Sequence, residues 1–337
     1  MRTLVGVLML LVPILLAAPS AGTVAAPDLV VSLPPLMNCL PIALAQTWEL
    51  FAKHGIEVQV IGISDTQERS AALSTGHLDG VMCDVSRALL DIGTGLDLVI
   101  TSAARPPVQT GSDTLAVVSP ASFEADSFET AFNRGFRIAT VFQSDLEYQI
   151  DGLLQSLGHD RSPSATYAFW TDLLQIAIWF GAQSLPVAAF PEPYLTYLTT
   201  YAPPGAAALE VNILSTFEDV ELLPSIIVFR REVVEEHPEV LESFYAAYRE
   251  SIERMNTIDR LELLDTALDT ALGLFFPGSP KEAIPEDVLL SIAIPMFQAP
   301  TVLSRAHYDG VAAWMIRRGY IGTAPAYDAV VSLCFIP

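Results

Sequence analysis

The residue types that carry out catalysis are present in this sequence, but they do not stand in catalytic patterns. The five histidines, at positions 54, 77, 159, 237 and 307, show neither HxH nor HExxH spacing, so a metal-dependent hydrolase would lack its ligands. The three cysteines, at positions 39, 83 and 334, form no CxxC pair, and none has an evident histidine partner. The sequence also has no GxSxG nucleophile elbow and no Gly-rich phosphate loop. This pattern is typical of a binding protein without catalytic residues, metal ligands or a cofactor.

Polar and aromatic side chains recur instead in four loops, each between an expected strand and an expected helix. The loops are Met37-Asn38-Cys39, Cys83-Asp84-Val85-Ser86, Phe142-Gln143-Ser144-Asp145 and Phe190-Pro191-Glu192-Pro193-Tyr194. In open α/β sheets ligands bind outside the carboxyl ends of the strands, where helix N-termini present unpaired N–H groups. We therefore expect the loops to face one cleft. The candidate ligand-binding residues are Asn38, Cys39, Cys83, Asp84, Arg105, Phe142, Gln143, Ser144, Phe190, Glu192 and Tyr194.

Several of these candidates also have a purely structural interpretation. Asp84 and Ser144 are of the types preferred as helix N-caps, and Asp145 could simply complement the dipole of its own helix. Glu192 could do the same in the first turn of the next helix. An aromatic residue at a strand end is more often part of the core, so we expect two of four aromatic candidates to contact a ligand. The four are Phe142, Trp170, Phe190 and Tyr194.

The charge of the ligand depends on which ionisable groups reach the cleft. Arg105 follows an expected strand and could pair with a ligand acid, or it could bind loop carbonyls beside Pro106-Pro107. In the first case sulfonate, nitrate or carboxylate ligands are favoured. Two acids with several aromatic side chains would instead favour a neutral or cationic heteroaromatic ligand, which is the interpretation we prefer.

Cys39 and Cys83 leave two alternatives open. Both follow strands that should be near neighbours in one sheet, and a disulfide needs Cα atoms about 4.4–6.8 Å apart, which adjacent strand ends could provide. The alternative is two separate buried thiols that pack as small hydrophobic groups.

The elements that would position the four loops alternate short apolar runs with helix-period segments. Strands are expected over 29–33, 57–61, 80–83, 96–102, 114–118, 136–142, 165–169, 187–190, 209–214 and 225–229, and helices dominate after residue 231. This alternation predicts α/β units on mostly parallel sheets. The stretch 105–113 is rich in Pro, Gly, Thr and Ser and predicts a crossing between two lobes. We expect lobe 1 to comprise 27–112 and 225–337, and lobe 2 to comprise 113–224.

Composition excludes several classes of protein. The 337 residues include 17 Lys and Arg against 39 Asp and Glu, for a formal net charge of −22, and 51% of the residues are hydrophobic. An apolar half is enough for a large core and excludes a disordered chain. The negative charge disfavours nucleic acid and anionic lipid as partners, because both would be repelled.

Residues 1–26 have the pattern of a secretory signal peptide. An apolar run of 15 residues from Leu4 to Ala18 follows Arg2, contains Pro13 and is followed by small residues up to Ala26. A membrane anchor is the alternative, but a span needs about 20 apolar residues. We therefore expect export to the periplasm or the outer face of the cytoplasmic membrane.

Several segments, taken in order, resemble the exported substrate-binding proteins of ABC importers, in the SsuA-like group that serves sulfonates, nitrate, taurine and thiamine-precursor pyrimidines. The matching stretches are 36–41 (LMNCLP), 72–80 (ALSTGHLDG), 137–140 (RIAT), 187–194 (VAAFPEPY), 227–231 (IVFRR) with 236–240 (EHPEV), and 314–320 with 327–328. The likeness spans nearly the whole chain after residue 26.

The resemblance implies a two-lobed α/β fold of the type II periplasmic-binding-protein class, with a ligand cleft between lobes joined by two crossing strands. It implies capture of a small organic nutrient by hinge closure near Gly111–Thr114 and Leu223–Ser225, and delivery by a monomer to an ABC permease. The family often places a glutamate where Glu192 stands, which implies a ligand contact there. The alternative is an enzyme resembling the thiamine-pyrimidine synthase of the same fold group, but that enzyme is intracellular and uses clustered His and Cys. A weaker alternative is a surface sensor that docks through an acidic face.

Overall fold

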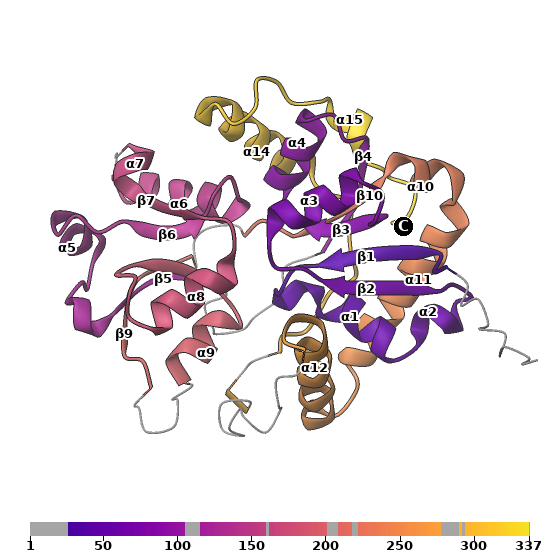
Figure 1. Ribbon diagram of the computed structural model, residues 1–337, viewed down its shortest axis with the longest axis horizontal. Helices are drawn as coiled ribbons and strands as arrows, with labels where there is room; N and C mark the ends of the chain where they lie inside the picture. The colour runs from indigo at the N-terminus through magenta and orange to yellow at the C-terminus, as the bar shows by residue number, and fades with distance from the viewer. Residues whose placement is uncertain are drawn as a thin grey trace, which may run out of the picture.

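The computed structural model describes residues 26–104, 115–159, 162–200, 208–217, 222–277, 290–291 and 294–336. The strands of these residues form two five-stranded sheets, which lie side by side in Figure 1. We call the described residues 26–104 and 225–336 lobe 1, on the right of that view, and 115–224 lobe 2, on the left. The boundary expected near residue 112 lies outside the described residues.

The sheet of lobe 1 has the strand order β2-β1-β3-β10-β4. Its strands are β1 (Leu29–Leu33), β2 (Val58–Gly62), β3 (Gly80–Cys83), β4 (Leu98–Ala103) and β10 (Ile226–Arg230). Strand β1 pairs in parallel with β2 and β3, whereas β10 is antiparallel to β3 and β4.

The sheet of lobe 2 repeats this plan with the order β7-β6-β8-β5-β9. Its strands are β5 (Leu115–Pro120), β6 (Ile138–Val141), β7 (Tyr167–Trp170), β8 (Ala188–Pro191) and β9 (Val211–Thr216). Strand β6 is parallel to β7 and β8, whereas β5 is antiparallel to β8 and β9.

Both sheets are therefore mixed rather than mostly parallel, and the position of the interface between the lobes explains why. Strands β1, β3, β6 and β8 end toward the other lobe, because the residues after them line the cavity between the lobes. Strands β5 and β10 begin at that cavity, since Leu115 and Ser225 also line it. A strand that starts where its neighbours end must run against them.

The helices cover both faces of each sheet. In lobe 1 they are α1 (Leu40–Thr47), α2 (Leu50–Lys53), α3 (Thr66–Ser74), α4 (Val85–Gly93), α10 (Arg231–Glu236), α11 (Pro238–Met255), α12 (Arg260–Phe275), α14 (Arg305–Arg318) and α15 (Tyr327–Val330), with a 3₁₀ turn at Met37–Cys39. In lobe 2 they are α5 (Phe128–Asn133), α6 (Asp145–Ser156), α7 (Pro163–Thr166), α8 (Leu173–Gly181) and α9 (Tyr194–Thr200), with a 3₁₀ turn at Ala121–Phe123.

Local sequence signals account for several helix ends. Asp65 caps α3 by accepting from the amides of Gln67 and Glu68, and Ser144 caps α6 by accepting from Glu147 N. Both helices begin with a capping-box pattern, DTQE at 65–68 and SDLE at 144–147. Helices α1 and α2 are separate, because Glu49 adopts a left-handed φ of 56° between them.

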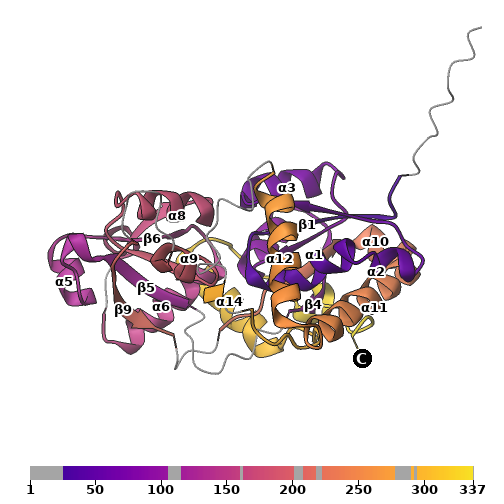
Figure 2. The ribbon, with the colours of Figure 1, turned by 90° about the horizontal axis from the view of Figure 1, so that it is seen from below.

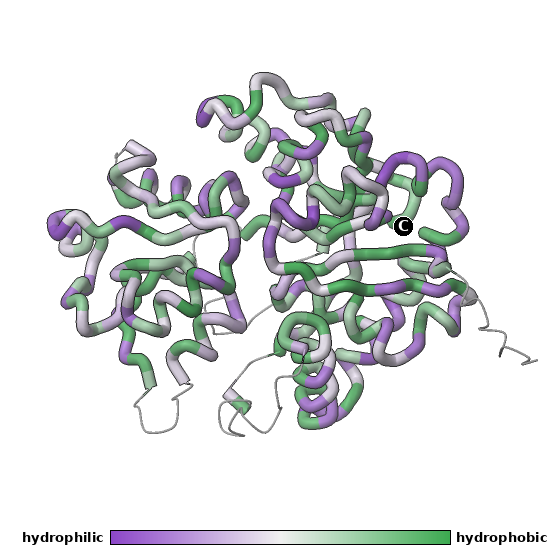
Figure 3. Tube along the Cα trace, in the orientation of Figure 1, coloured by the Kyte–Doolittle hydropathy of each residue, from purple (hydrophilic) through white to green (hydrophobic). Residues whose placement is uncertain are grey.

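The strands are buried on both faces, so alternate residues serve different cores. In β5, Leu115 and Val117 pack with α5 and α6, whereas Ala116 and Val118 pack with α8 and α9. Lobe 1 follows the same rule, with α1, α11 and α12 on one face and α3, α4 and α14 on the other. The hydropathy colours in Figure 3 show β1 mostly as hydrophobic green.

Helix α14 belongs to the core of lobe 1 but reaches lobe 2. It packs on α4 and also contacts α6, and the view in Figure 2 shows it between the two lobes.

Among the described helices, none is long and apolar enough to cross a bilayer.

Position 80 requires a glycine because β3 and β10 approach each other closely there. A Cβ on Gly80 would lie 2.9 Å from the carbonyl oxygen of Val228 and closer still to the buried ring of Phe229. We expect Gly80→Ala to lower the free energy of unfolding by about 1–3 kcal/mol. Gly273→Ala, in α12 with no atom within 4 Å of the added Cβ, should raise it by about 0.5–1 kcal/mol. Urea denaturation checks both, and a Gly80→Ala protein of native stability would contradict the packing.

Candidate functional site

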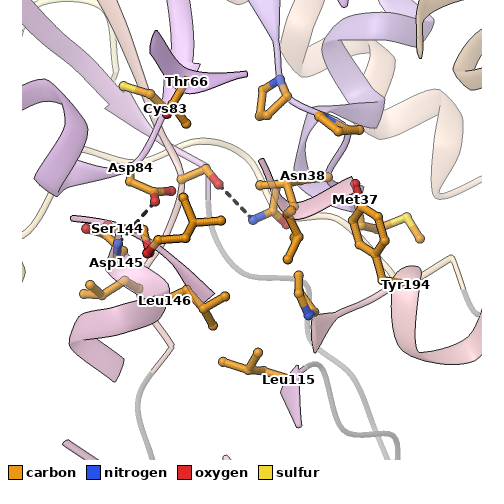
Figure 4. Close-up of a pocket in the computed structure, with 18 of the residues that line it drawn as sticks. Met37, Asn38, Thr66, Cys83, Asp84, Leu115, Ser144, Asp145, Leu146 and Tyr194 are labelled. Atoms are coloured by element: carbon orange, nitrogen blue, oxygen red, sulfur yellow. Dashed lines mark hydrogen bonds between the residues drawn. The ribbon is translucent and has the colours of Figure 1, made fainter. Parts of the chain in front are cut away.

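A cavity of about 190 Å³ lies between the two lobes, where strands β1, β3, β6, β7 and β8 end. Figure 4 shows its wall, with Asn38 and Asp84 from lobe 1 facing Ser144, Asp145 and Tyr194 from lobe 2. The polar residues that line it are Asn38, Ser64, Thr66, Arg69, Asp84, Ser144, Asp145, Gln149, Thr171, Asp172, Glu192, Tyr194 and Ser225. The apolar part comes mainly from Pro34, Pro35, Leu36, Met37, Leu115, Val141, Leu146, Leu173, Leu222 and Leu223.

Two aspartates exchange helix caps across the cavity. Asp145 of α6 accepts hydrogen bonds from Val85 N and Ser86 N at the start of α4, both at 2.9 Å. In return, Asp84, which precedes α4, accepts from Asp145 N at 3.2 Å. Asp84 occupies the N-cap position of α4 but does not cap that helix. The expected self-capping role of Asp84 is therefore wrong, because the carboxylate of the other lobe takes those amides.

This exchange places two carboxyl groups close together away from water. Burial raises the pKa of both, and the negative charge of Asp84 adds to the rise for Asp145, whose pKa reaches about 7. The amides of Val85 and Ser86 oppose this rise by bonding the charged form. With a pKa of about 7, the Asp145 carboxyl group is about half protonated at neutral pH.

A second polar contact joins α14 to α6 beside the cavity. Arg318 forms ion pairs with Glu147 at 2.6 Å and with Asp151 at 3.0 Å. Trp314 Nε1 donates to Asp151 Oδ2 at 2.7 Å, and the Tyr320 hydroxyl donates to Glu147 Oε1 at 2.7 Å. The Glu147 side chain is fully buried, so its charge depends on these partners. We call Arg318, Trp314, Tyr320, Glu147 and Asp151 the α14 latch.

Further polar groups of the two lobes meet on the other side of the cavity. Ser64 Oγ donates to Asp172 Oδ2 at 3.2 Å, and Thr66 Oγ1 donates to the Thr171 carbonyl at 3.5 Å. Asp172 also caps α8 by accepting from Leu174 N. Arg69, buried nearby, donates from Nη1 to the carbonyls of Ile63 and Ser64.

Glu192 and Tyr194 line the cavity from lobe 2. The Glu192 carboxylate accepts from Thr196 N at 3.1 Å and from Thr196 Oγ1 at 2.9 Å, so it holds the first turn of α9 as well as bordering the cavity. Tyr194 is buried, and both it and Met37 of lobe 1 line the cavity (Figure 4).

Six of the candidate residues come together at the cavity: Asn38, Cys83, Asp84, Ser144, Glu192 and Tyr194. Four others do not border it. Cys39 and Phe190 are buried in the cores of lobes 1 and 2, and Phe142 is 42% exposed where it packs on Phe169 and Tyr320. Gln143 takes a left-handed φ of 57° and donates its amide to Glu147.

Of the four aromatic candidates, only Tyr194 lines the cavity, where two were expected. Trp170 packs against the core of lobe 2. Arg105, the expected cation, lies outside the described residues.

The structure decides between the alternatives for the cysteines. Both thiols are free and buried, with Cys39 in the core on the α1 face of the first sheet and Cys83 in the core on the α4 face. They do not form a disulfide because the sheet separates them. Burial raises the pKa of Cys39 to about 12 and that of Cys83 well above its usual value, so both are unreactive as nucleophiles. Within the described residues, no group of three His, Cys, Asp or Glu side chains could hold a metal ion.

Several cavity residues are not among the candidates expected from the sequence. Thr171 and Asp172 follow β7, so the rule that selected the other four loops applies to them as well. Arg69 lies inside α3 and Gln149 inside α6. Helical periodicity shows which face of a helix such residues share, but it could have pointed to them only if the position of the cleft had been known.

The raised pKa of Asp145 links stability to pH. An acid whose pKa is raised by folding contributes stability that is full below about pH 4 and is lost as the pH rises through about 7. We expect the melting temperature to fall more steeply between about pH 5 and 8 in the native protein than in Asp145→Asn, which cannot titrate there. Differential scanning fluorimetry measures both slopes, with the exposed Asp309→Asn as the charge control. If the melting temperatures of the native protein and of Asp145→Asn fell equally steeply with pH, the raised pKa of Asp145 would be contradicted.

Comparison with known proteins rests on solved structures. No protein-family model matches the sequence, and no curated protein matches it. The alkanesulfonate-binding protein SsuA from Xanthomonas axonopodis pv. citri, bound to MOPS, has a TM-score of 0.69 and 16% identity over 91% of this chain and 99% of that chain. The periplasmic nitrate-binding protein NrtA from Synechocystis PCC 6803 has a TM-score of 0.65 and 14% identity over 90% of this chain and 85% of that chain.

A Candida albicans gene product described as having the generic periplasmic binding protein fold is also similar, with a TM-score of 0.62 and 13% identity over 91% of this chain and 96% of that chain. At these identities the likeness shows the fold alone. This fold agrees with the two mixed sheets, the helices on both of their faces and the cavity between the lobes. The chain has the two-lobed α/β fold of type II periplasmic binding proteins.

Proposed function

We propose that this chain is the exported solute-binding component of an ABC importer, and not an enzyme. It captures a small organic nutrient in the cavity between the lobes and delivers it, as a monomer, to the transmembrane subunits of a permease. The observation that carries the proposal is that both lobes supply polar groups to one cavity. Such a cavity is complete only when the lobes meet, so a ligand that contacts both sides shifts the population toward the closed form.

Three observations support this proposal. The fold is shared with binding proteins for sulfonate and nitrate. Residues 1–26 have the pattern of a signal peptide, as an exported protein requires. Among the described residues no three His, Cys, Asp or Glu side chains are grouped to hold a metal ion, and the thiols of Cys39 and Cys83 are buried with raised pKa, whereas the thiamine-pyrimidine synthase alternative uses clustered His and Cys. Its ligand is of the thiamine-precursor pyrimidine, sulfonate or nitrate type that the family serves.

Closure would occur by rotation at two segments. Leu223 and Ser225, at the return to lobe 1, line the cavity, so a small change in their backbone would move one wall relative to the other. The segment 111–114, expected as the second hinge, lies outside the described residues.

Native mass spectrometry of the gently purified protein tests the proposal, followed by a thermal-shift screen of pyrimidines, sulfonates, nitrate and amino-acid-like compounds. We expect a bound small molecule, or a stabilisation that grows as RT ln(1 + [L]/Kd). Turnover of any compound in the screen would support the enzyme alternative, and a screen without binding or turnover would overturn the proposal.

The α14 latch gives a test of lobe motion that needs no ligand. Arg318→Ala leaves the buried charge of Glu147 without its ion partner, a change that costs about 3–5 kcal/mol in buried pairs. We expect this variant to populate an open form with a larger radius of gyration in small-angle scattering. The matched control is Arg317→Ala, the exposed neighbouring arginine, which should scatter like the native protein. Equal radii for the two variants would contradict a role of the latch in closure.

A further inference from the structure

Two hydrogen-bond donors that border the cavity are buried without an acceptor among the described residues. Gln149 Nε2 belongs to α6 of lobe 2, and Arg69 Nε belongs to α3 of lobe 1. The two residues are 8% and 5% exposed, and both line the cavity. Buried donors are normally paired, because an unpaired one costs free energy. These donors therefore indicate a solute that supplies acceptors.

The position of Gln149 on its helix places it in the cavity wall. It follows Asp145 by four residues on α6, so the two residues lie on the same face of that helix. Asp145 accepts from Val85 N and Ser86 N, so this face is turned toward lobe 1. The amide group of Gln149 is thus placed where the two lobes meet.

Arg69 uses only part of its guanidinium group to hold the fold. Its Nη1 donates to the carbonyls of Ile63 and Ser64, whereas Nε has no acceptor among the described residues. The carboxyl groups of Asp65 and Asp84 lie near enough to balance the charge of Arg69. Arg69 therefore adds a donor to the wall without making the wall positive.

The charge of the wall limits the kind of acceptor that fits. Against the one guanidinium of Arg69, the described wall carries four carboxyl groups, on Asp84, Asp145, Asp172 and Glu192. It remains net negative even if Asp84 and Asp145 are both protonated. A negative wall repels an anion, and an unpaired donor finds no acceptor on an ammonium ion. An uncharged group with an acceptor oxygen meets both conditions.

We propose that the cavity binds an uncharged solute through a carbonyl or similar acceptor oxygen, and that Gln149 Nε2 donates to this oxygen. The inference rests on the proposed solute-binding function and narrows its ligand to an uncharged compound that bears an acceptor. Arg69 Nε offers a further donor on the side of lobe 1. Leu36, Met37 and Leu146 form an apolar surface for the carbon skeleton.

The first test compares ligands that differ only in their polar group. Butanamide and benzamide are each measured beside the amine and the sulfonate of the matching carbon skeleton, by thermal shift and then calorimetry near neutral pH. We expect at least one amide to bind about tenfold or more tightly than both of its counterparts, because only the amide brings an uncharged acceptor oxygen to a buried donor.

Two variants of Gln149 test the donor itself. Gln149→Glu keeps the size of the side chain but replaces the donor with an acceptor, and Gln149→Met removes the donor while filling a similar volume. Each should weaken amide binding by about tenfold or more. The matched controls are Gln155→Glu and Gln155→Met, at an exposed position of the same helix, which should bind amides like the native protein.

The melting temperature without ligand distinguishes a binding role of Gln149 from a structural one. A donor without a partner does not stabilise the free protein, so Gln149→Met should melt at or above the temperature of the native protein. If Gln149→Met melted clearly below both the native protein and Gln155→Met, Gln149 would be a structural residue and the assignment would be contradicted.

The outcomes separate this inference from the proposed function. If no amide binds more tightly than its amine and sulfonate counterparts, or if Gln149→Glu binds amides as the native protein does, the assignment of an uncharged acceptor to Gln149 is overturned. If an amine, a sulfonate or another compound of the wider screen then binds, solute binding stands. If nothing in this panel or the wider screen binds, both proposals fail.

Discussion

The meeting of the two lobes depends on a short exchange of hydrogen bonds between Asp84 and Asp145. Each aspartate accepts amides at the start of the other lobe's helix, so three backbone N–H groups that would need water or ligand are paired only while α4 and α6 face each other. Bonds from N–H groups to a charged carboxylate contribute about 1.5–3 kcal/mol each. The raised pKa of both acids shows that this contact has a cost in burying charge.

The rest of the architecture follows from this meeting point. Parallel strands of both sheets end at the cavity, and the strands that enter each lobe there, β5 and β10, run antiparallel to them. The α14 latch adds a second attachment, in which Arg318 compensates the buried charge of Glu147. Closure therefore has polar contacts on several sides of the cavity, and a bound solute adds to them.

The sequence predicted the elements well, because apolar runs and caps are local signals. The strands 29–33 and 80–83 and the helices after residue 231 are found as expected, and Asp65 and Ser144 cap the helices that follow them. It predicted the place of the cavity from strand ends, but not side-chain directions, which decide whether an aromatic such as Phe190 enters the core or the cleft. Nor could it show that Asp84 and Asp145 exchange partners, since that depends on how two lobes distant in sequence are placed.

The most direct measurement is hydrogen exchange at the amides of Val85, Ser86 and Asp145, with and without saturating solute identified by native mass spectrometry. These amides bond only to the opposite lobe, so their exchange reports separation of the lobes. The account predicts that the solute slows exchange at all three together and leaves the buried strand β10 unchanged. Exchange at these amides that is the same with and without bound solute would contradict capture by closure.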